Sequence, residues 1–330
     1  MDRRQSLVSI AAIGAAGALP RSAWAEQQKT YRVGFLSLGT RASLASDIEA
    51  LKSGLRAFGY EEGKNLEIVS RFADGRYERL PELADELIAS KPDLMVSSGT
   101  PGLLALKKAS STIPIVMATG GDPVASGLVA SAAKPGGNVT GVGFFIAELC
   151  VKRMEVAKEI IPGTTRMAFV TNFRNPATGP LAVDVEKAAS GLKLALERFD
   201  VNAPSEFDGA FREINRHGIK IAVVAEDAVL YYAAKQLADA ATQHGIAAFG
   251  WPEFAEQAGG LVGYGAADFQ YGLRRVGYFA DRIFKGTKPA DLPVERGSPA
   301  YRIVINLRTA KALGLRIPVQ VLQRADTRIE

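Results

Sequence analysis

Residues Ile113–Val129 read IPIVMATGGDPVASGLV, an apolar run rich in β-branched residues that ends in an acidic residue followed at once by proline. A short apolar run of this kind is typical of a buried strand. Aspartate caps the free N–H groups at a helix start, and proline suits the first helical position. The segment therefore predicts a strand, a turn at Asp122-Pro123 and a helix, which is one unit of an α/β sheet.

The same order of features recurs along the chain. Thr100-Pro101, Asn175-Pro176 and Trp251-Pro252 also follow apolar runs, although Trp251 offers no side-chain oxygen as a cap. The expected strands are Arg32–Ser37, Asn65–Phe72, Leu94–Ser97, Ile113–Ala118, Val139–Phe144, Arg166–Thr171, Ile219–Val224, Ile246–Phe249, Leu261–Tyr264 and Arg302–Ile305. The expected helices between them include Ser46–Phe58, Leu80–Ser90, Ala182–Glu197, Leu230–Gln243 and Phe269–Phe284. This alternation predicts parallel sheets that are covered by helices on both faces.

The alternation starts again after Phe145, which favours two similar α/β lobes over one very wide sheet. A long helix near the end of the second series and the stretch ADLPVERGSP (290–299) indicate that the chain returns between the lobes. We therefore expect an N-terminal lobe of residues 31–144 plus about 266–300, and a C-terminal lobe of residues 145–265 plus about 301–330. The predicted fold class is α/β, with two doubly wound parallel-sheet lobes.

The first 25 residues have the features of an export signal peptide. Arg3 and Arg4 are followed by the apolar stretch Leu7–Leu19, and Ala23-Trp24-Ala25 fits the small-x-small cleavage pattern. The apolar stretch is too short to span a bilayer. The sequence therefore predicts a periplasmic protein that does not span the membrane when mature. The paired arginines suggest the twin-arginine route, and the general secretory route stays open.

Composition and charge argue against several classes of protein. Of 330 residues, 47% are hydrophobic and 23% are charged, which is ordinary for a globular protein. Removal of the signal peptide takes away three arginines and one aspartate and lowers the net charge from +5 to about +3. The basic residues are scattered, so we expect no nucleic-acid partner. The lone Cys150 excludes an intramolecular disulfide and is expected to be a small buried residue.

The turns after the strands carry the functional prediction. Parallel α/β units bind ligands beyond the carboxyl ends of their strands, where helix N-termini offer free N–H groups and positive partial charge. Helix capping explains each turn taken alone. Polar turns from two lobes, taken together, predict a crevice for a carboxylate or another small polar ligand. The candidate ligand-binding residues are Ser37, Thr100, Asp122, Asn175, Asp227, Trp251 and Tyr264.

Three of these candidates have roles that the residue type suggests. Asp227 follows the strand ending at Val224 and can cap a helix, meet a ligand ammonium group, or do both. Six aromatic residues near the turns could lie against a planar ligand group, namely Phe144, Phe145, Phe173, Tyr231, Trp251 and Tyr264. Ordinary packing explains most of them, and Trp251 and Tyr264 are the better candidates.

Signals for catalysis are weak throughout the sequence. His217 and His244 have no second metal ligand at a suitable spacing, so we expect no metal site. Gly141-Val142-Gly143 lacks the third glycine of a dinucleotide fingerprint, and no G-x-S-x-G elbow is present, so we expect no cofactor. Asp122 and Asp227 could act as an acid/base pair, but the sequence gives no distance between them.

Long stretches of the chain, in order, match one protein family. They are GLRAFGYEEGKNLEI, FADGRYERLPELADEL, STIPIVMATGGDPVASGLVAS, KPGGNVTGV, QAGGLVGYGA and VINLRTAKALGLRIP. The chain resembles periplasmic substrate-binding proteins of ABC transporters, some of which are tryptophan or tyrosine transport components. The resemblance implies a type I periplasmic-binding fold, with two lobes joined by a three-strand hinge. It also places crevice loops at Ser37, Thr100, Asp122, Asn175, Asp227 and Trp251.

The resulting hypothesis is an exported receptor that binds a small organic solute, for instance an amino acid or aromatic acid, and delivers it to an ABC permease. Its mechanism would be hinge closure around the ligand. An exported enzyme that uses crevice carboxylates is one alternative. A sensory module that presents its ligand to a membrane receptor is another, and the sequence does not separate it from a transport protein.

Overall fold

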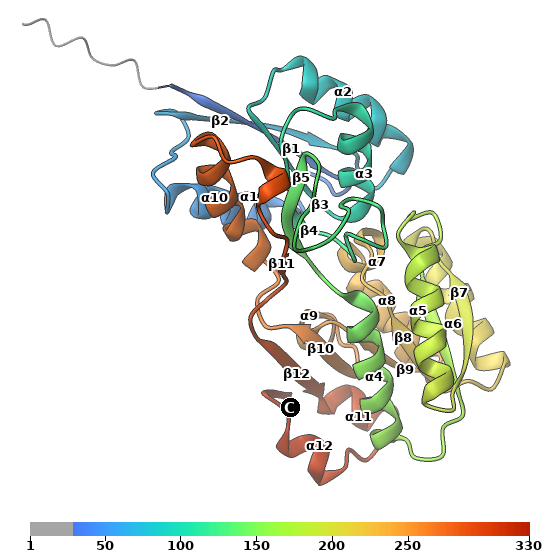
Figure 1. The fold of residues 1–330 in the computed structure, drawn as a ribbon. Helices are drawn as coiled ribbons and strands as arrows, with labels where there is room; N and C mark the ends of the chain where they lie inside the picture. The colour runs from blue at the N-terminus through green and yellow to red at the C-terminus, as the bar shows by residue number, and fades with distance from the viewer. Residues whose placement is uncertain (1–28) are drawn as a thin grey trace, which may run out of the picture.

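The computed structural model describes residues 29–330, so the expected signal peptide at residues 1–25 lies outside the described residues. It contains two sheets, each covered by helices, stacked one above the other in Figure 1. We call the six-stranded sheet with its helices the N-terminal lobe and the seven-stranded sheet with its helices the C-terminal lobe. The predicted α/β class with two mostly parallel sheets is confirmed.

The N-terminal lobe has the strand order β11-β5-β4-β3-β1-β2, with every pair parallel. Its strands are β1 (Tyr31–Ser37), β2 (Leu66–Phe72), β3 (Leu94–Ser98), β4 (Ile115–Thr119), β5 (Val139–Gly143) and β11 (Glu295–Arg296). Its helices are α1 (Ala45–Arg56), α2 (Leu80–Ala89), α3 (Thr100–Ala109) and α10 (Tyr271–Phe284), with 3₁₀ turns at Tyr77–Arg79 and Pro289–Asp291. The central strands are almost wholly buried because helices cover both of their faces.

Helices α1 and α10 cover one face of this sheet and α2 and α3 cover the other. The α1–α10 pair is unusually close. A Cβ atom on Gly54 would lie 2.1 Å from the carbonyl oxygen of Arg274, and one on Gly277 would lie 2.0 Å from that of Gly54. The two backbones therefore touch where the helices cross. This contact ties α10, which comes late in the sequence, to the first helix of the lobe.

The C-terminal lobe has the strand order β13-β12-β10-β9-β8-β6-β7, in which only β10 and β12 pair antiparallel. Its strands are β6 (Arg166–Thr171), β7 (Ala195–Asp200), β8 (Ile221–Val224), β9 (Ala247–Gly250), β10 (Val262–Ala266), β12 (Tyr301–Asn306) and β13 (Thr327–Ile329). Its helices are α4 (Ile146–Ile160), α5 (Thr178–Gly191), α6 (Phe207–Arg216), α7 (Ala228–Tyr232), α8 (Ala234–Gln243), α9 (Pro252–Glu256), α11 (Leu307–Ala312) and α12 (Val319–Gln323), with a 3₁₀ turn at Pro204–Glu206. Apolar clusters fill both faces of the sheet.

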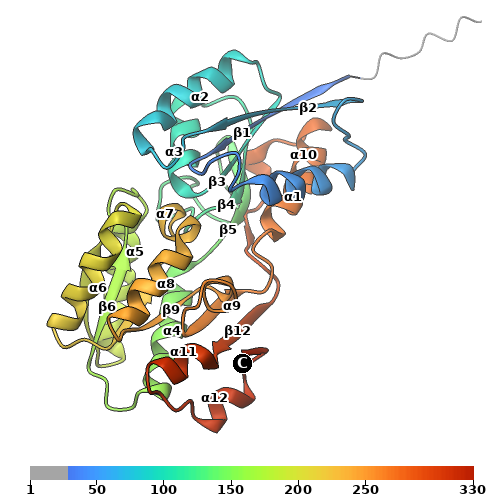
Figure 2. The ribbon, with the colours of Figure 1, turned by 180° about the vertical axis from the view of Figure 1, so that it is seen from behind.

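The chain passes between the two sheets three times. The passages follow β5, β10 and β11, and they run along the same edge of the molecule in Figures 1 and 2. In both lobes the strand order reverses beside the first strand, between β1 and β3 and between β6 and β8. Ligands of doubly wound sheets bind at such a reversal, beyond the carboxyl ends of the strands.

Three local expectations were wrong. Ala182–Glu197 is not one helix, because α5 ends at Gly191 and the edge strand β7 begins at Ala195, after a turn in which Lys193 has φ 57°. Leu230–Gln243 is divided into α7 and α8 at Ala233. No helix follows Asp122-Pro123. There the Asp122 carboxylate accepts from the N–H groups of Val124 and Ala125, and the turn ends at Gly127 with φ 70°.

No helix within residues 29–330 is long and apolar enough to cross a membrane.

Cys150 is a free, fully buried cysteine in α4, and burial raises the pKa of its thiol to about 12. At neutral pH this thiol is protonated and packs as an apolar group.

Candidate functional site

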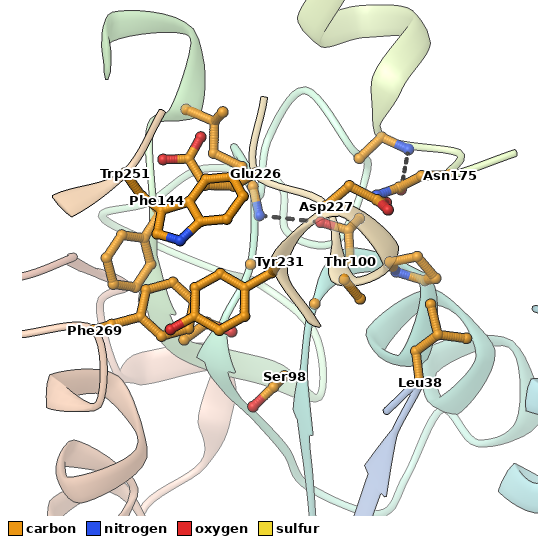
Figure 3. Close-up of a pocket in the computed structure, with 18 of the residues that line it drawn as sticks. Leu38, Ser98, Thr100, Phe144, Asn175, Glu226, Asp227, Tyr231, Trp251 and Phe269 are labelled. Carbon is orange, nitrogen blue, oxygen red and sulfur yellow. Dashed lines mark hydrogen bonds between the residues drawn. The ribbon is translucent and has the colours of Figure 1, made fainter. Parts of the chain in front are cut away.

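A cavity of about 120 Å³ lies between the two lobes, where the strand-order reversals of both sheets face each other. In Figure 3 its aromatic side chains gather on one side, and Thr100, Asn175, Asp227 and Leu38 lie on the other. The two lobes contribute different chemistry to its wall.

The N-terminal lobe contributes mostly small residues and backbone. They come from the ends of β1, β3 and β4, namely Leu38, Ser98–Gly102 and Thr119–Gly121. Gly99 has φ 91°, a conformation that glycine adopts without strain, and it lets the chain turn sharply from β3 into α3. The buried Thr100 hydroxyl accepts from the N–H of Gly121 at 3.0 Å. This wall combines a helix N-terminus with hydroxyl groups, a combination that suits a carboxylate.

Ser98 offers a free hydrogen-bonding group in this wall. Its hydroxyl oxygen is buried and has no hydrogen-bond partner among residues 29–330. A buried polar atom without a partner is costly, so a ligand that hydrogen-bonds it would stabilise the protein.

Asp227 is the most heavily hydrogen-bonded residue of the opposite wall. It caps α7, as the sequence predicted, by accepting from the N–H of Val229 at 2.9 Å. Its carboxylate also accepts from Nδ2 of Asn172 at 3.2 Å and of Asn175 at 3.0 Å. The hydroxyl of Tyr77, which belongs to the N-terminal lobe, donates to Asp227 Oδ2 at 2.9 Å. The Tyr77 contact joins the two lobes directly across the cavity.

Glu226, next to Asp227, is held by a buried arginine. Arg153 of α4 is fully buried and its guanidinium bonds both carboxylate oxygens of Glu226, one of them at 2.9 Å. It also donates to the carbonyl oxygens of Val224 and Tyr264. Arg153 thus fixes Glu226 and joins the end of β8 to the middle of β10.

The lining of the cavity is acidic. Asp47, Glu226, Asp227 and Glu253 line it, and no lysine, arginine or histidine does so within residues 29–330. Glu226 and Glu253 are paired with Arg153 and Arg302 behind the wall. Asp47 and Asp227 have only neutral hydrogen-bond donors among the described residues. Two uncompensated carboxylates favour a ligand that carries a positive charge.

Asp47 is a carboxylate whose ionised form is destabilised by burial. It lies in the first turn of α1, and Nε2 of Gln270 donates to it at 3.4 Å. Burial raises the pKa of its carboxyl group, and the hydrogen bond from Gln270 opposes the rise. A cation in the cavity would favour the ionised form.

An aromatic stack forms one side of the cavity. The ring of Tyr231 lies between Trp251, at a centroid distance of 5.2 Å, and Phe269, at 4.8 Å. Phe144 lies 6.1 Å from Phe269, and both residues stand in passages between the lobes. Burial raises the pKa of the Tyr231 hydroxyl, so it stays protonated. The stacked rings give the cavity an apolar side that suits an aromatic ligand group.

The structure brings four of the seven predicted residues to this cavity. Thr100, Asn175, Asp227 and Trp251 line it, whereas the other three lie elsewhere. Ser37 is buried at the end of β1, and Asp122 lines a neighbouring groove. Tyr264 stacks on Tyr301 at 6.2 Å, and its carbonyl accepts from Arg153.

Sequence reasoning missed several lining residues, namely Asp47, Tyr77, Glu253 and Phe269. Asp47 and Tyr77 follow β1 and β2, so the same rule about carboxyl ends of strands, applied to all loops, would have included them. Glu253 is the second residue of α9, directly after Trp251-Pro252. Phe269 stands in a passage between lobes and had no such signal. No group of three or more potential metal ligands occurs in the described chain.

Fold and cavity together define a two-lobed α/β binding protein of the type I periplasmic kind. The chain belongs to the ABC transporter substrate binding protein family, whose model matches residues 36–329. This confirms the resemblance found in the sequence. Proteins of this family are exported, and they capture a small-molecule ligand for a membrane permease.

Three similar proteins illustrate the relationship. A tyrosine-binding protein of Clostridioides difficile (strain R20291) is 25% identical over 291 residues, which cover 88% of this chain and 83% of that protein. A crystal structure of a conserved domain protein from Vibrio cholerae is 29% identical with a TM-score of 0.83, over 91% of this chain and 100% of that one. An ABC domain in complex with L-Trp from Streptococcus pneumonia shares the fold, with 24% identity, a TM-score of 0.82 and the same coverage.

Proposed function

We propose that this protein is a periplasmic receptor that binds an aromatic amino acid between its lobes and delivers it to an ABC permease. The observation that carries the proposal is the combination of three kinds of group in the cavity wall: hydroxyl and backbone groups at the start of α3, the carboxylates of Asp47 and Asp227, and stacked aromatic rings. A zwitterion with a planar side chain matches all three. The tyrosine-binding relative and the L-Trp complex support the same class of ligand.

The ligand has one site for each of its groups. Its carboxylate is received by the start of α3, with the hydroxyls of Ser98 and Thr100. Its ammonium group lies near Asp227 and Asp47, the carboxylates without a cationic partner in the described chain. Its ring packs against the side of the Trp251–Tyr231–Phe269 stack that lines the cavity. An aromatic acid without an amine, such as benzoate, leaves these carboxylates uncompensated and binds more weakly.

Binding is coupled to closure of the two lobes. The three passages form the hinge, with boundaries near residues 144, 266 and 300, and the ligand contacts both lobes only when they are closed. Its preference for the closed state drives the population shift. The Tyr77–Asp227 hydrogen bond stabilises the same closed state.

The carboxylates of the cavity serve binding rather than catalysis in this proposal. Both oxygens of Glu226 contact Arg153, so this carboxylate is held as an ion pair. Asp227 is held by hydrogen bonds from neutral donors, which suits a fixed negative charge that binds an ammonium group. The paired arginines of the signal peptide support export by the twin-arginine route.

The test is a binding screen by thermal shift and calorimetry on the mature protein. The panel pairs L-tyrosine with tyramine, which lacks the carboxylate, and with 3-(4-hydroxyphenyl)propionate, which lacks the amine. A ligand at 100 times its Kd adds about 2.7 kcal/mol of stability. We expect L-tyrosine to bind most tightly and the propionate least. Equal affinity for the propionate and L-tyrosine would refute the assigned ammonium site.

Two additional readouts separate a transport receptor from the alternatives. Mass analysis after incubation should recover unaltered L-tyrosine, whereas conversion to a product would indicate an enzyme. Small-angle scattering should show a narrower molecule with ligand than without it.

A further inference from the structure

A second hollow of about 310 Å³ lies beside the ligand cavity. It is lined by four residues of the turn Gly121–Ser126 of the N-terminal lobe and, in the C-terminal lobe, by residues within 145–151 and 177–188, which belong to α4 and α5 or directly precede them. We call it the side groove. Four residues line both the side groove and the cavity, namely Gly121, Ile146, Ala177 and Leu181. They form the partition between the two hollows.

Two side chains supply most of this partition. Ile146 is the first residue of α4 and Leu181 lies in the first turn of α5, and both are half-buried against the core of the C-terminal lobe. Gly121 faces them from the N-terminal lobe without a side chain. A Cβ atom on Gly121 would meet one neighbouring atom within 4 Å, the hydroxyl oxygen of Thr100 at 3.3 Å. The width of the partition therefore depends on Ile146 and Leu181.

The partition stands next to the carboxylate site of the proposed function. Gly121 belongs to it, and the N–H of Gly121 donates to the hydroxyl of Thr100. An extension from the ligand's carboxyl end, such as the next residue of a peptide or the group of an amide, would meet the partition first.

The lining of the side groove combines apolar residues with carboxylates. The carboxylates are those of Asp122, Glu148 and Asp184, and no basic residue of the described chain lines the groove. Glu148 is paired with Arg296 at 2.7 Å. The remaining negative charge disfavours an extension that ends in a free carboxylate, as a dipeptide does, and leaves neutral apolar extensions acceptable.

We propose that Ile146 and Leu181 restrict the site to single amino acids by excluding ligands extended at the carboxyl end. The inference rests on the proposed function, because it assumes that the ligand carboxylate lies at Thr100. Shortening either side chain joins the cavity to the side groove. One methylene in a closed pocket changes discrimination by about 10- to 200-fold, so the effect should be large.

The experiment measures the affinities of L-tyrosine and L-tyrosine benzylamide by calorimetry, with the mature native protein and with Leu181→Ala and Ile146→Ala. Val183→Ala is the matched control, because Val183 lies on the same helix, is 60% exposed and lines neither hollow. We expect the native protein and Val183→Ala to prefer L-tyrosine strongly. In Leu181→Ala or Ile146→Ala the ratio of the two affinities should fall at least about tenfold.

The outcomes separate the two proposals. If Leu181→Ala and Ile146→Ala both fold, bind L-tyrosine and keep the native ratio of the two ligand affinities, then Ile146 and Leu181 have no role in specificity. Equal affinity of the native protein for both ligands would also overturn the inference. Failure of the native protein to bind L-tyrosine or any other amino acid would instead overturn the proposed function, and the inference with it.

Discussion

The two walls of the cavity come from the same type of sheet and yet differ in chemistry. The N-terminal wall at the ends of β1, β3 and β4 is built from small residues, hydroxyls and backbone. The C-terminal wall carries Glu226, Asp227 and Glu253 and the rings of Tyr231 and Trp251. In the proposed function, equivalent positions in the two folds would therefore contact different groups of one ligand, and both lobes contribute to the lining of the cavity.

The two walls also differ in the interactions that support them from behind. A buried ion pair, Arg153–Glu226, supports the C-terminal wall, whereas main-chain turns and the Thr100–Gly121 hydrogen bond support the N-terminal wall. Charged side chains need such support because a buried charge without a partner is costly. Substitutions in the C-terminal wall should therefore have the larger effects.

The largest effect is expected from Arg153→Met, which leaves Glu226 without its cation. Removing one partner of a buried ion pair costs about 3–5 kcal/mol. Urea unfolding of the ligand-free protein would measure this loss. Arg198→Met is the control, because the Arg198–Glu186 pair is exposed and such pairs contribute about 0–1 kcal/mol.

The double variant Arg153→Met/Glu226→Leu tests the reason for that loss. It removes both charges, so a large part of the stability should return. A double variant as unstable as Arg153→Met would mean that Arg153 acts through its bonds to the carbonyls of Val224 and Tyr264 instead.

Asp227→Asn should have the next largest effect, this time on ligand affinity. A hydrogen bond to a charged group contributes about 1.5–3 kcal/mol, so an amine ligand should bind about 10- to 150-fold more weakly. Calorimetry with L-tyrosine checks this, and Asp239→Asn on the surface of α8 serves as control. Unchanged affinity would show that Asp227 holds Tyr77 and the asparagines but not the ligand.

The sequence predicted the strands of both sheets more completely than the residues that line the cavity between them. Strands such as β8 (Ile221–Val224) are buried on both faces, so their apolar runs are easy to recognise. The location of the site followed from the polar turns at strand ends. That rule placed Thr100, Asn175, Asp227 and Trp251 in one cavity.

The sequence did not reveal which partner each side chain takes. Arg153 lies 73 residues from Glu226, and Tyr77 lies 150 residues from Asp227. Pairs so far apart come together only through the packing of whole elements. The helix expected after Asp122-Pro123 does not form, and the reason is local. The Asp122 carboxylate accepts from the N–H groups of Val124 and Ala125 within a tight turn, and the positive φ of Gly127 then changes the direction of the chain. A cap followed by proline permits a helix and does not require one.

Thr100→Val tests the N-terminal wall. It keeps the shape of the side chain and removes the hydroxyl that bonds the N–H of Gly121. The loss of one hydrogen bond is worth about 0.5–1.5 kcal/mol, so L-tyrosine should bind about 2- to 12-fold more weakly. Tyramine, which has no carboxylate, should lose less. Equal losses for both ligands would assign Thr100 to the turn alone.

Tyr77→Phe tests the direct hydrogen bond between the lobes. The variant removes one bond to Asp227, worth about 1 kcal/mol, and should weaken L-tyrosine binding about fivefold. Scattering should also show a more open ligand-free molecule. Tyr278→Phe is a suitable control, since Tyr278 lies in α10 away from the cavity. No change in either measurement would mean that closure depends on the ligand alone.

Asp47→Asn should give the smallest effect. The contribution of Asp47 to stability should depend on pH in the opposite sense to that of a carboxylate whose pKa is lowered by folding. Burial raises the pKa of Asp47, so the folded protein binds this proton more readily than the unfolded chain. Stability from this group therefore falls as pH rises from its ordinary value of about 3.9 through the raised value. Ligand-free Asp47→Asn should be slightly more stable than the native protein above that interval, and no more stable below it.

Saturating L-tyrosine should change the sign of this difference, because an ammonium group beside Asp47 favours the ionised form. Thermal unfolding at several pH values, with and without the ligand, gives the four curves that are needed. If the ligand leaves the difference between native protein and Asp47→Asn unchanged, then Asp47 does not face the cation. The positive end of the ligand would then belong to the C-terminal wall alone, and the contrast between the two walls would be complete.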